Sequence, residues 1–186
     1  MKILVTGGAG FIGSHLVRKL LSKGQDVTIL DDFNDFYDPE IKRQNVLSFE
    51  GKVNVVEGNI CDKEIVNQTF TAGNFDAVVH LAARAGVRPS IQHPQLYIDT
   101  NIGGTFNLLE AAKNSGCARF VFGSSSSVYG LATVVPFSEE LPLPQTLSPY
   151  AATKLAGEQL CGNYAYLHGL RVVCLRFFTV YGPGQR

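Results

Sequence analysis

Several common features are absent from this chain or present in small number. It has no tryptophan, one methionine and no Cys-x-x-Cys pair among its cysteines, which are Cys61, Cys117, Cys161 and Cys174. This cysteine usage favours reduced thiols in a cytoplasmic protein over a disulfide framework. No apolar run approaches the roughly 20 residues that a membrane-spanning helix needs, and the N-terminus carries no secretory signal pattern. The sequence therefore predicts neither a membrane partner nor secretion.

An excess of charge of either sign is also absent. Sixteen lysines and arginines balance sixteen aspartates and glutamates, so the formal net charge is zero. This balance argues against a broad surface for nucleic acid or anionic lipid. No cluster of side chains has the spacing of a metal site, and no metal is predicted. Because 45% of the 186 residues are hydrophobic and 17% charged, the chain can bury a core.

Strand and helix patterns alternate along the chain. Strands are expected at residues 2–6, 27–30, 53–57, 76–81, 119–122 and 171–177. Helices are expected at residues 11–22, 62–70, 97–115 and 150–168, with a loop of one or two helical turns at 32–45 and an extended loop at 130–149. Each strand looks apolar on both faces, which is typical of a parallel sheet. We expect an α/β fold: a doubly wound parallel sheet of the Rossmann type with helices on both faces.

A glycine-rich turn joins the first strand to the first helix. Gly7, Gly10 and Gly13 permit a tight turn and a close approach of the main chain to a pyrophosphate group, with Phe11 and Ile12 opening the helix. The helix N-terminus adds free N–H groups and a partial positive charge. The second strand ends at Asp31 and Asp32, whose carboxylates can accept hydrogen bonds from ribose hydroxyls and repel a 2′-phosphate. The pattern predicts NAD rather than NADP as cofactor.

A tyrosine and a lysine open the helix expected at residues 150–168. Tyr150 and Lys154 are four residues apart and share one helix face. A cation so close is expected to lower the pKa of the tyrosine, which could then act as a base while hydride leaves for nicotinamide. The serine run before Tyr129 follows the fifth strand, and no Gly-x-Ser-x-Gly elbow of a serine hydrolase surrounds it. Tyr129 itself is expected to pack or to line the substrate site.

These motifs together resemble the extended short-chain dehydrogenase/reductase superfamily. The resemblance implies that Ser125, four residues before the tyrosine of Val-Tyr-Gly, holds the reacting oxygen beside Tyr150 and Lys154. It implies an adenine contact at Asn59 and Ile60, although an acid is commonly found where Asn59 stands. It also places the segment Leu81, Ala82 and Ala83 beside the cofactor. His80 is expected to be a packed histidine without a chemical role.

Four further segments are similar to UDP-glucuronate 4-epimerases. They are residues 30–38, 85–88, 124–139 and 175–183. The resemblance implies NAD-dependent inversion of C4 of a UDP-sugar, with UDP-glucuronate becoming UDP-galacturonate through a 4-keto sugar. Substrate contacts are expected from Ser125, Ser126, Ser127, Thr179 and Arg186, of which Arg186 could fork a carboxylate or stay solvated. Arg88 could equally serve phosphate or structure.

Other functions stay open from the sequence. One is 4-epimerisation of UDP-glucose and UDP-galactose or of an N-acetylhexosamine, although UDP-galactose 4-epimerases usually carry asparagine where Thr179 stands. Another is a decarboxylase or dehydratase, although dehydratases place an Asp-Glu pair where Ser126 and Ser127 stand. A dinucleotide sensor or scaffold protein is the non-enzymatic alternative, and the intact catalytic side chains argue against it.

The resemblance also concerns the organisation of the protein. Residues 1–186 are expected to form the NAD-binding domain that carries the catalytic residues, within a longer two-domain enzyme whose C-terminal substrate-binding region is largely missing here. The full-length protein is expected to be a homodimer that pairs the helices at 97–115 and 150–168. The chain alone is expected to turn over sugar nucleotides poorly.

Overall fold

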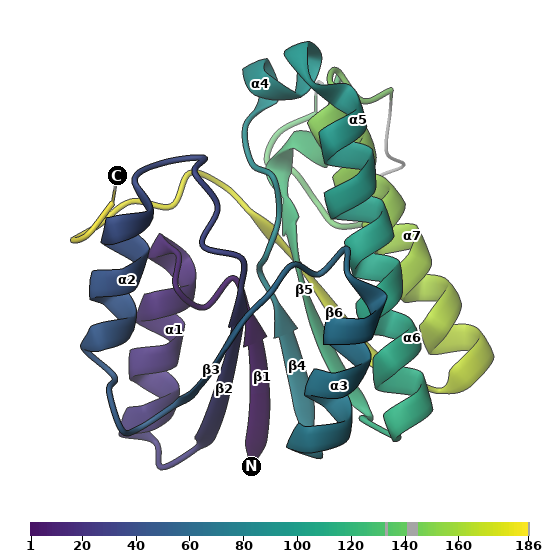
Figure 1. Cartoon of the computed structure of the whole chain (residues 1–186). Coiled ribbons are helices and arrows are strands. Elements are labelled where there is room, and N and C mark those ends of the chain that lie inside the picture. Colours follow the sequence, from purple (N-terminus) through teal and green to yellow (C-terminus); the bar gives the residue numbers. More distant parts are fainter. Residues whose placement is uncertain (133, 141–144, 186) are drawn as a thin grey trace.

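A single parallel sheet forms the centre of the molecule (Figure 1). The computed structural model describes residues 1–132, 134–140 and 145–185. In the sheet the strands lie in the order β3-β2-β1-β4-β5-β6, and every neighbouring pair is parallel. This is the strand order of the Rossmann fold, with a change of direction between β1 and β4. The strands are β1 (Lys2–Thr6), β2 (Asp26–Asp31), β3 (Asn54–Glu57), β4 (Ala77–His80), β5 (Arg119–Ser125) and β6 (Arg171–Phe177).

Helices cover both faces of the sheet, as the sequence predicts. The helices α1 (Phe11–Ser22) and α2 (Pro39–Leu47) lie on one face. The other face carries α3 (Lys63–Gly73), α6 (Thr105–Ser115) and α7 (Pro149–His168) (Figure 1). Two short helices, α4 (Val87–Gln92) and α5 (Pro94–Tyr97), stand above the carboxyl end of the sheet. No helix in the described part of the chain combines the length and apolar character needed to cross a bilayer.

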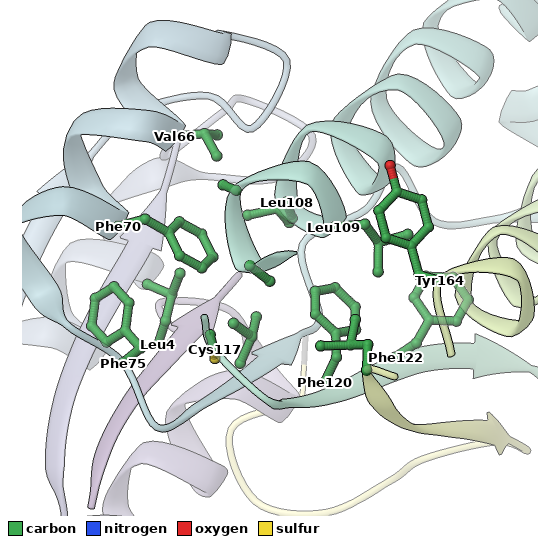
Figure 2. Close-up of a cluster of buried hydrophobic side chains, with 14 of the residues drawn as sticks. Leu4, Val66, Phe70, Phe75, Leu108, Leu109, Cys117, Phe120, Phe122 and Tyr164 are labelled. Atoms are coloured by element: carbon green, nitrogen blue, oxygen red, sulfur yellow. The ribbon is translucent and has the colours of Figure 1, made fainter. Parts of the chain in front are cut away.

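The larger hydrophobic core lies under α3, α6 and α7. Figure 2 shows Phe120 and Phe122 of β5 pointing toward Leu108 and Leu109 of α6, all of them buried. Burying side chains of this size contributes about 1.5–3 kcal/mol each. The smaller core joins α1 to β1 and β2 on the opposite face. Two cores on the two faces of one sheet hold the strand ends at fixed positions, and those ends build the site.

The outer strands differ from the prediction that every strand is apolar and covered on both faces. β3 is an edge strand with three exposed residues of four. In β6, Val173 and Leu175 point to the face opposite the larger core, and they are 54% and 39% exposed. They face the side of α1 and α2, and the core under these helices extends across the sheet as far as Val79 of β4 but includes no residue of β6. The prediction was wrong here because a strand's composition does not reveal its place at an edge.

The helix α2 also differs from the expected loop at residues 32–45. Its N-terminal turn is stabilised by Asp38, whose carboxylate accepts a hydrogen bond from the Glu40 N–H, and by Pro39 at the first helical position. The helix has little hydrophobic periodicity to mark it, since Lys42 is its one buried residue. In contrast, the predicted cap of α3 is confirmed, because Asp62 accepts from the N–H groups of Glu64 and Ile65.

The helix expected at residues 97–115 is interrupted. α5 ends at Tyr97, a π-helical segment spans Ile98–Gly104, and α6 begins at Thr105. Gly104 packs so closely on Ile60 that an added Cβ would lie 2.5 Å from its side chain. The Thr105 hydroxyl donates to the Asn101 carbonyl at 2.6 Å inside the turn. Such π segments widen a helix locally and are frequent beside functional sites.

Candidate active site

The carboxyl ends of the strands border one cavity of about 580 Å³. It extends across the change of direction between β1 and β4, where open parallel sheets bind their ligands. The segment after β6 crosses this edge toward α1 and α2 (Figure 1), and Gln185 lines the cavity. All predicted cofactor and catalytic residues line it too: Gly7, Gly10, Phe11, Ile12, Gly13, Asp31, Asp32, Asn59, Ile60, Leu81, Ala82, Ala83, Ser125, Tyr150 and Lys154.

The glycine loop leaves no room for side chains. Gly7 has a φ of +71°, and an added Cβ would lie 2.7 Å from the main-chain nitrogen of Ala82. A Cβ on Gly13 would lie 2.1 Å from the carbonyl oxygen of Gly7. Only glycine allows this backbone conformation and these approaches. The main chain at the start of α1 therefore borders the cavity directly, which fits a pyrophosphate group.

Asp31 supports the glycine loop from the end of β2. Its carboxylate accepts hydrogen bonds from the N–H of Ala9 at 3.1 Å and of Phe33 at 3.0 Å. The ammonium of Lys42, on α2, lies 3.7 Å from the same carboxylate. Burial raises the pKa of the Asp31 carboxyl, while Lys42 and the two main-chain donors act in the opposite direction. Some of the lone pairs of the Asp31 carboxylate thus already accept hydrogen bonds from the protein main chain.

Asn59 and Asp32 form a second polar pair in the cavity. The Asn59 amide lies 3.4 Å from the Asp32 carboxylate, and the Asn59 side-chain oxygen accepts from the Cys61 N–H at 2.8 Å. Asn34 also donates to Asp32 through its side-chain amide and its main chain. Neutral amides thus neighbour the carboxylate at this end. Hydrogen-bond donors and acceptors for an adenosine moiety are present where the motif predicted them.

The catalytic candidates come from two elements that meet at the cavity. Ser125 ends β5, and Tyr150 lies in the first turn of α7. Ser148 caps that helix by accepting from the Ala151 N–H at 3.1 Å, with Pro149 at the first helical position. Ser125 interacts with the Tyr150 hydroxyl and opposes the rise in its pKa that burial causes. A hydroxyl of a bound substrate could therefore be held by both groups.

Lys154 is buried one turn further along α7. Its ammonium donates to the Gly123 carbonyl at 2.7 Å and lies 5.0 Å from the centre of the Phe122 ring. Burial lowers the pKa of Lys154 from 10.5 to about 8. The side chain is 5% exposed, so the cavity is its route to solvent.

The expected effect of Lys154 on the tyrosine is not found. Burial raises the pKa of Tyr150 above its ordinary value, and the hydrogen bond from Ser125 is what opposes that rise. The prediction from helical spacing was wrong because it ignored burial. Lys154 is engaged with Gly123 and Phe122, and both side chains lose solvation. In this structure Ser125 is the group that favours the tyrosinate.

His80 is a packed histidine, as predicted. It is 1% exposed and forms hydrogen bonds with the hydroxyls of Thr6 at 2.7 Å and Thr105 at 2.9 Å. Burial lowers the pKa of His80 to about 3, so its ring is neutral at physiological pH. The ring ties β1 and β4 to α6 below the cavity.

The residues predicted to contact the substrate do not come together at the cavity as the cofactor and catalytic residues do. Ser126 and Ser127 lie in a 3-10 turn after β5 and do not line the cavity, and Thr179 is exposed beyond β6. Arg88 is exposed on α4, away from the cavity lining. Arg186 lies outside the described residues. Tyr129 is buried against Phe137 at a ring distance of 4.7 Å, which confirms its packing role.

Sequence reasoning missed Asn101 and Arg84. Asn101 is 1% exposed in the π-helical segment, and its side chain bonds both the N–H and the carbonyl of Arg84. It also donates to the Thr153 hydroxyl at 3.1 Å, between Tyr150 and Lys154 on α7. Arg84 lines the cavity, unlike Arg88. Hydrophobic periodicity does not reveal a buried asparagine. The one available signal was the position of Asn101, a polar residue within a helix that was expected to pack on the sheet.

Fold and site together define a Rossmann-type dinucleotide-binding protein with a Ser-Tyr-Lys constellation. The chain belongs to the NAD dependent epimerase/dehydratase family, whose family model matches residues 3–186. It is 47% identical over 186 residues to UDP-glucuronate 4-epimerase 4 of Arabidopsis thaliana, covering 99% of this chain and 43% of the relative. It is 43% identical to a UDP-glucuronate 4-epimerase of Thermodesulfobacterium geofontis, covering 98% of this chain and 57% of the relative. The chain thus spans about half the length of these relatives.

Solved structures share the arrangement. The UDP-glucuronic acid 4-epimerase of Bacillus cereus, in complex with UDP-glucuronic acid and NAD, matches with a TM-score of 0.91 and 42% identity. That match covers all of this chain and 59% of the other. The UDP-glucose 4-epimerase of Thermus thermophilus, in complex with NAD, also gives a TM-score of 0.91, with 39% identity and 58% of its chain covered.

Proposed function

We propose that the enzyme carrying this chain is an NAD-dependent UDP-sugar 4-epimerase that interconverts UDP-glucuronate and UDP-galacturonate. One observation carries the proposal: Ser125, Tyr150 and Lys154 converge on the cavity that the glycine loop also borders. A dinucleotide and the reacting sugar can therefore meet there. The name UDP-glucuronate 4-epimerase, borne by relatives that are 43–49% identical, supports the choice of sugar.

The cofactor fits the cradle described above. The main chain around Gly7, Gly10 and Gly13 would hold the pyrophosphate, with Phe11 and Ile12 at the helix start. Asp31 and Asp32 would hold the adenosine ribose, Asn59 and Ile60 would border the adenine, and the segment Leu81–Ala83 would line the middle of the dinucleotide. When bound, NAD supplies the hydride acceptor for C4 of the sugar and the donor for its return.

Side chains of this part of the protein would then transfer the proton of the sugar C4 hydroxyl. Tyr150 accepts the proton of the C4 hydroxyl as the C4–H bond breaks and its two electrons leave with the hydride. Ser125 would donate its single hydroxyl proton to the same sugar oxygen and so hold it beside Tyr150. Lys154, which lies one turn further along α7 and is held by the Gly123 carbonyl, would assist as a cation in the wall of the cavity rather than by lowering the pKa of Tyr150. The 4-keto sugar turns in the cavity, and Tyr150 returns the proton when hydride reaches the opposite face.

The carboxylate of the uronate needs its own contacts. We assign these to Ser126, Ser127, Thr179 and Arg186. Hydroxyls and a guanidinium match a carboxylate, and residues 126 and 127 carry no acid or base that dehydration would need. A 4-keto uronate is a β-keto acid that can lose CO₂. These contacts would hold the carboxylate in an orientation that disfavours this loss.

A second candidate is epimerisation of UDP-glucose and UDP-galactose. It is favoured by the equal TM-score of the Thermus thermophilus structure, which shows that the fold alone does not distinguish the two sugars. The test is to incubate the full-length enzyme with catalytic NAD and each UDP-sugar, and to separate the products by chromatography. We expect UDP-galacturonate from UDP-glucuronate. Release of CO₂, a pentose product, or faster turnover of UDP-glucose would overturn this choice.

We further propose that residues 1–186 are the NAD-binding domain, with the catalytic residues, of a longer cytoplasmic two-domain enzyme that forms homodimers. Exposed apolar side chains on α6 and α7 support the dimer: Phe106, Tyr166 and Leu167 are 45%, 90% and 67% exposed. Exposed apolar side chains that gather into a patch are typical of a protein interface. Light scattering of the full-length enzyme would test it, with a monomer as the contrary result.

A further inference from the structure

The inner surface of α2 reaches the tip of the glycine loop. Asn45 donates a hydrogen bond from its side-chain amide to the Ala9 carbonyl at 2.9 Å. The N–H of Ala9 donates to the Asp31 carboxylate at 3.1 Å. Ala9 is fully buried between Gly8 and Gly10, so both of its main-chain polar groups are held by side chains. One residue at the tip of the loop is thus fixed from two elements.

The same surface of α2 holds the loop that follows β2. Lys42, one turn before Asn45, is 4% exposed and donates to the Asn34 carbonyl at 3.2 Å. Its ammonium lies 3.7 Å from Asp31 and 5.1 Å from the centre of the Tyr37 ring. Asp31 is therefore shared: it binds Ala9 on one side and faces Lys42 on the other. The two loops and α2 form one connected support.

We propose that Asn45 is a positioning residue that presets the phosphate-binding loop for NAD. The idea rests on the cofactor assignment made above. A loop with glycines at positions 7, 8 and 10 has more conformational freedom to lose than other segments. If a hydrogen bond already holds the loop in its binding geometry, ordering it does not reduce the affinity for the ligand. Asn45 touches no cavity atom itself, since it is not among the lining residues.

Binding measurements test the proposal without turnover. Asn45→Ala removes the donor, and Asn45→Asp replaces it with a carboxylate that cannot donate to Ala9. Gln44→Ala is the matched control, because Gln44 is an exposed neighbour on the same helix. We expect calorimetry to show NAD and ADP binding weakened about fivefold to twentyfold in both Asn45 variants, as for the loss of one hydrogen bond. Adenosine binding, and all ligands in the control, should stay within about twofold.

The measurement with adenosine distinguishes a specific effect on the phosphate-binding loop from a general loss of structure. A variant that merely loosened the domain would weaken adenosine and NAD alike, and that result would overturn the proposal. So would NAD binding within twofold of the unsubstituted chain in both Asn45 variants. Asn45→Ala should fold, because alanine raises helix propensity at a half-buried surface position.

Amide hydrogen exchange without ligand tests the support of the loop by Asn45 separately from the binding of NAD. In Asn45→Ala the N–H groups of Ala9 and Gly10 should exchange at least about fivefold faster, while α1 beyond its first turn keeps its protection. Unchanged exchange at Ala9 would overturn the positioning role whatever NAD does. If the unsubstituted chain fails to bind NAD while its loop is protected through Asn45, the cofactor assignment fails and the support of the loop stands.

Discussion

The cofactor side of the cavity and its substrate side are built differently. On the cofactor side, β1 and β2 end in glycines and carboxylates that are buried and bonded to main-chain groups, with Ala9 and Asp31 at 0% and 6% exposure. On the substrate side, the segment after β6 carries Phe178 and Tyr181 at 58% and 83% exposure. A hydrogen bond between the His15 side chain of α1 and the Pro183 carbonyl, at 2.8 Å, joins the two sides.

The difference shows how recognition is divided. A pyrophosphate group is bound by main-chain N–H groups, and a main chain held by short-range packing suits it. Among the side chains proposed to contact the sugar, Ser126 and Ser127 are half-buried and Thr179 is exposed. Tyr150 and Lys154 stand where the two sides meet, on a helix anchored in the core by Ala151 and Cys161. Substitutions at the junction and on each side test this difference in packing.

The largest effect is expected at the junction of the two sides. Tyr150→Phe removes the group that we propose takes the proton of the C4 hydroxyl, and losing a general base is expected to lower turnover by about 10²–10⁴-fold. NAD affinity should stay within about twofold, because the ring remains. Turnover of UDP-glucuronate by the full-length enzyme and NAD titration measure the two. Turnover within tenfold of the unsubstituted enzyme would remove Tyr150 as the base.

The second effect concerns the buried ammonium. Burial lowers the pKa of Lys154 from 10.5 to about 8, so below pH 8 the folded state carries the full cost of a buried charge. Between pH 8 and 10.5 the folded protein loses this proton while the unfolded chain keeps it, and stability from this group rises with pH by about 3 kcal/mol. Denaturant unfolding of the chain and of Lys154→Met at pH 7.5, 9 and 10.5 measures it. Parallel pH curves for the two proteins would contradict the assignment.

A third test concerns the cofactor side alone. Gly13→Ala places a Cβ 2.1 Å from the Gly7 carbonyl oxygen, so the loop must shift. We expect at least about tenfold weaker NAD binding and a free energy of unfolding lower by about 1–3 kcal/mol. Gly162→Ala on α7 is the control, because an added Cβ there meets nothing within 4 Å, and it should stabilise by about 0.5–1 kcal/mol. Equal NAD affinity for both variants would show that the loop tolerates side chains.

The smallest effect is expected on the substrate side. Tyr181→Ala removes an exposed ring and should change the free energy of unfolding of the chain by less than about 0.5 kcal/mol, with NAD affinity unchanged. Chemical denaturation and NAD titration check both. A loss above about 1 kcal/mol would mean that this side is packed, and the comparison would then fail.

Most of the fold could be predicted from the sequence. The alternation of strands and helices predicted the parallel sheet and helices on both faces, and Asp62 correctly predicted a cap. Helix α2 was predicted only as one or two helical turns within a loop, because its face toward the protein is polar, with Lys42 and Asn45 bonded to the loops at Asn34 and Ala9. Periodicity detects helices that pack apolar side chains, and α2 packs few.

The site was predicted where a motif is local. The Gly7 to Gly13 loop, Asp31 and the Tyr150 and Lys154 pair all line the cavity. The prediction that Lys154 lowers the pKa of Tyr150 was wrong, because burial depends on what the whole fold places around a side chain. Asn101 was missed for a similar reason: its partners Arg84 and Thr153 are 17 and 52 residues away.

The sequence by itself determined the class of fold and the cofactor cradle, and it predicted the groups to which we assign the proton transfer, because spacing within a turn or a helix sets these. The tertiary structure alone decided which of these groups are buried, how the Tyr150 and Lys154 pKa values shift, and that α2 supports the glycine loop. The physical reason is that desolvation and hydrogen bonds between distant segments arise only when the chain has folded and removed water from between them.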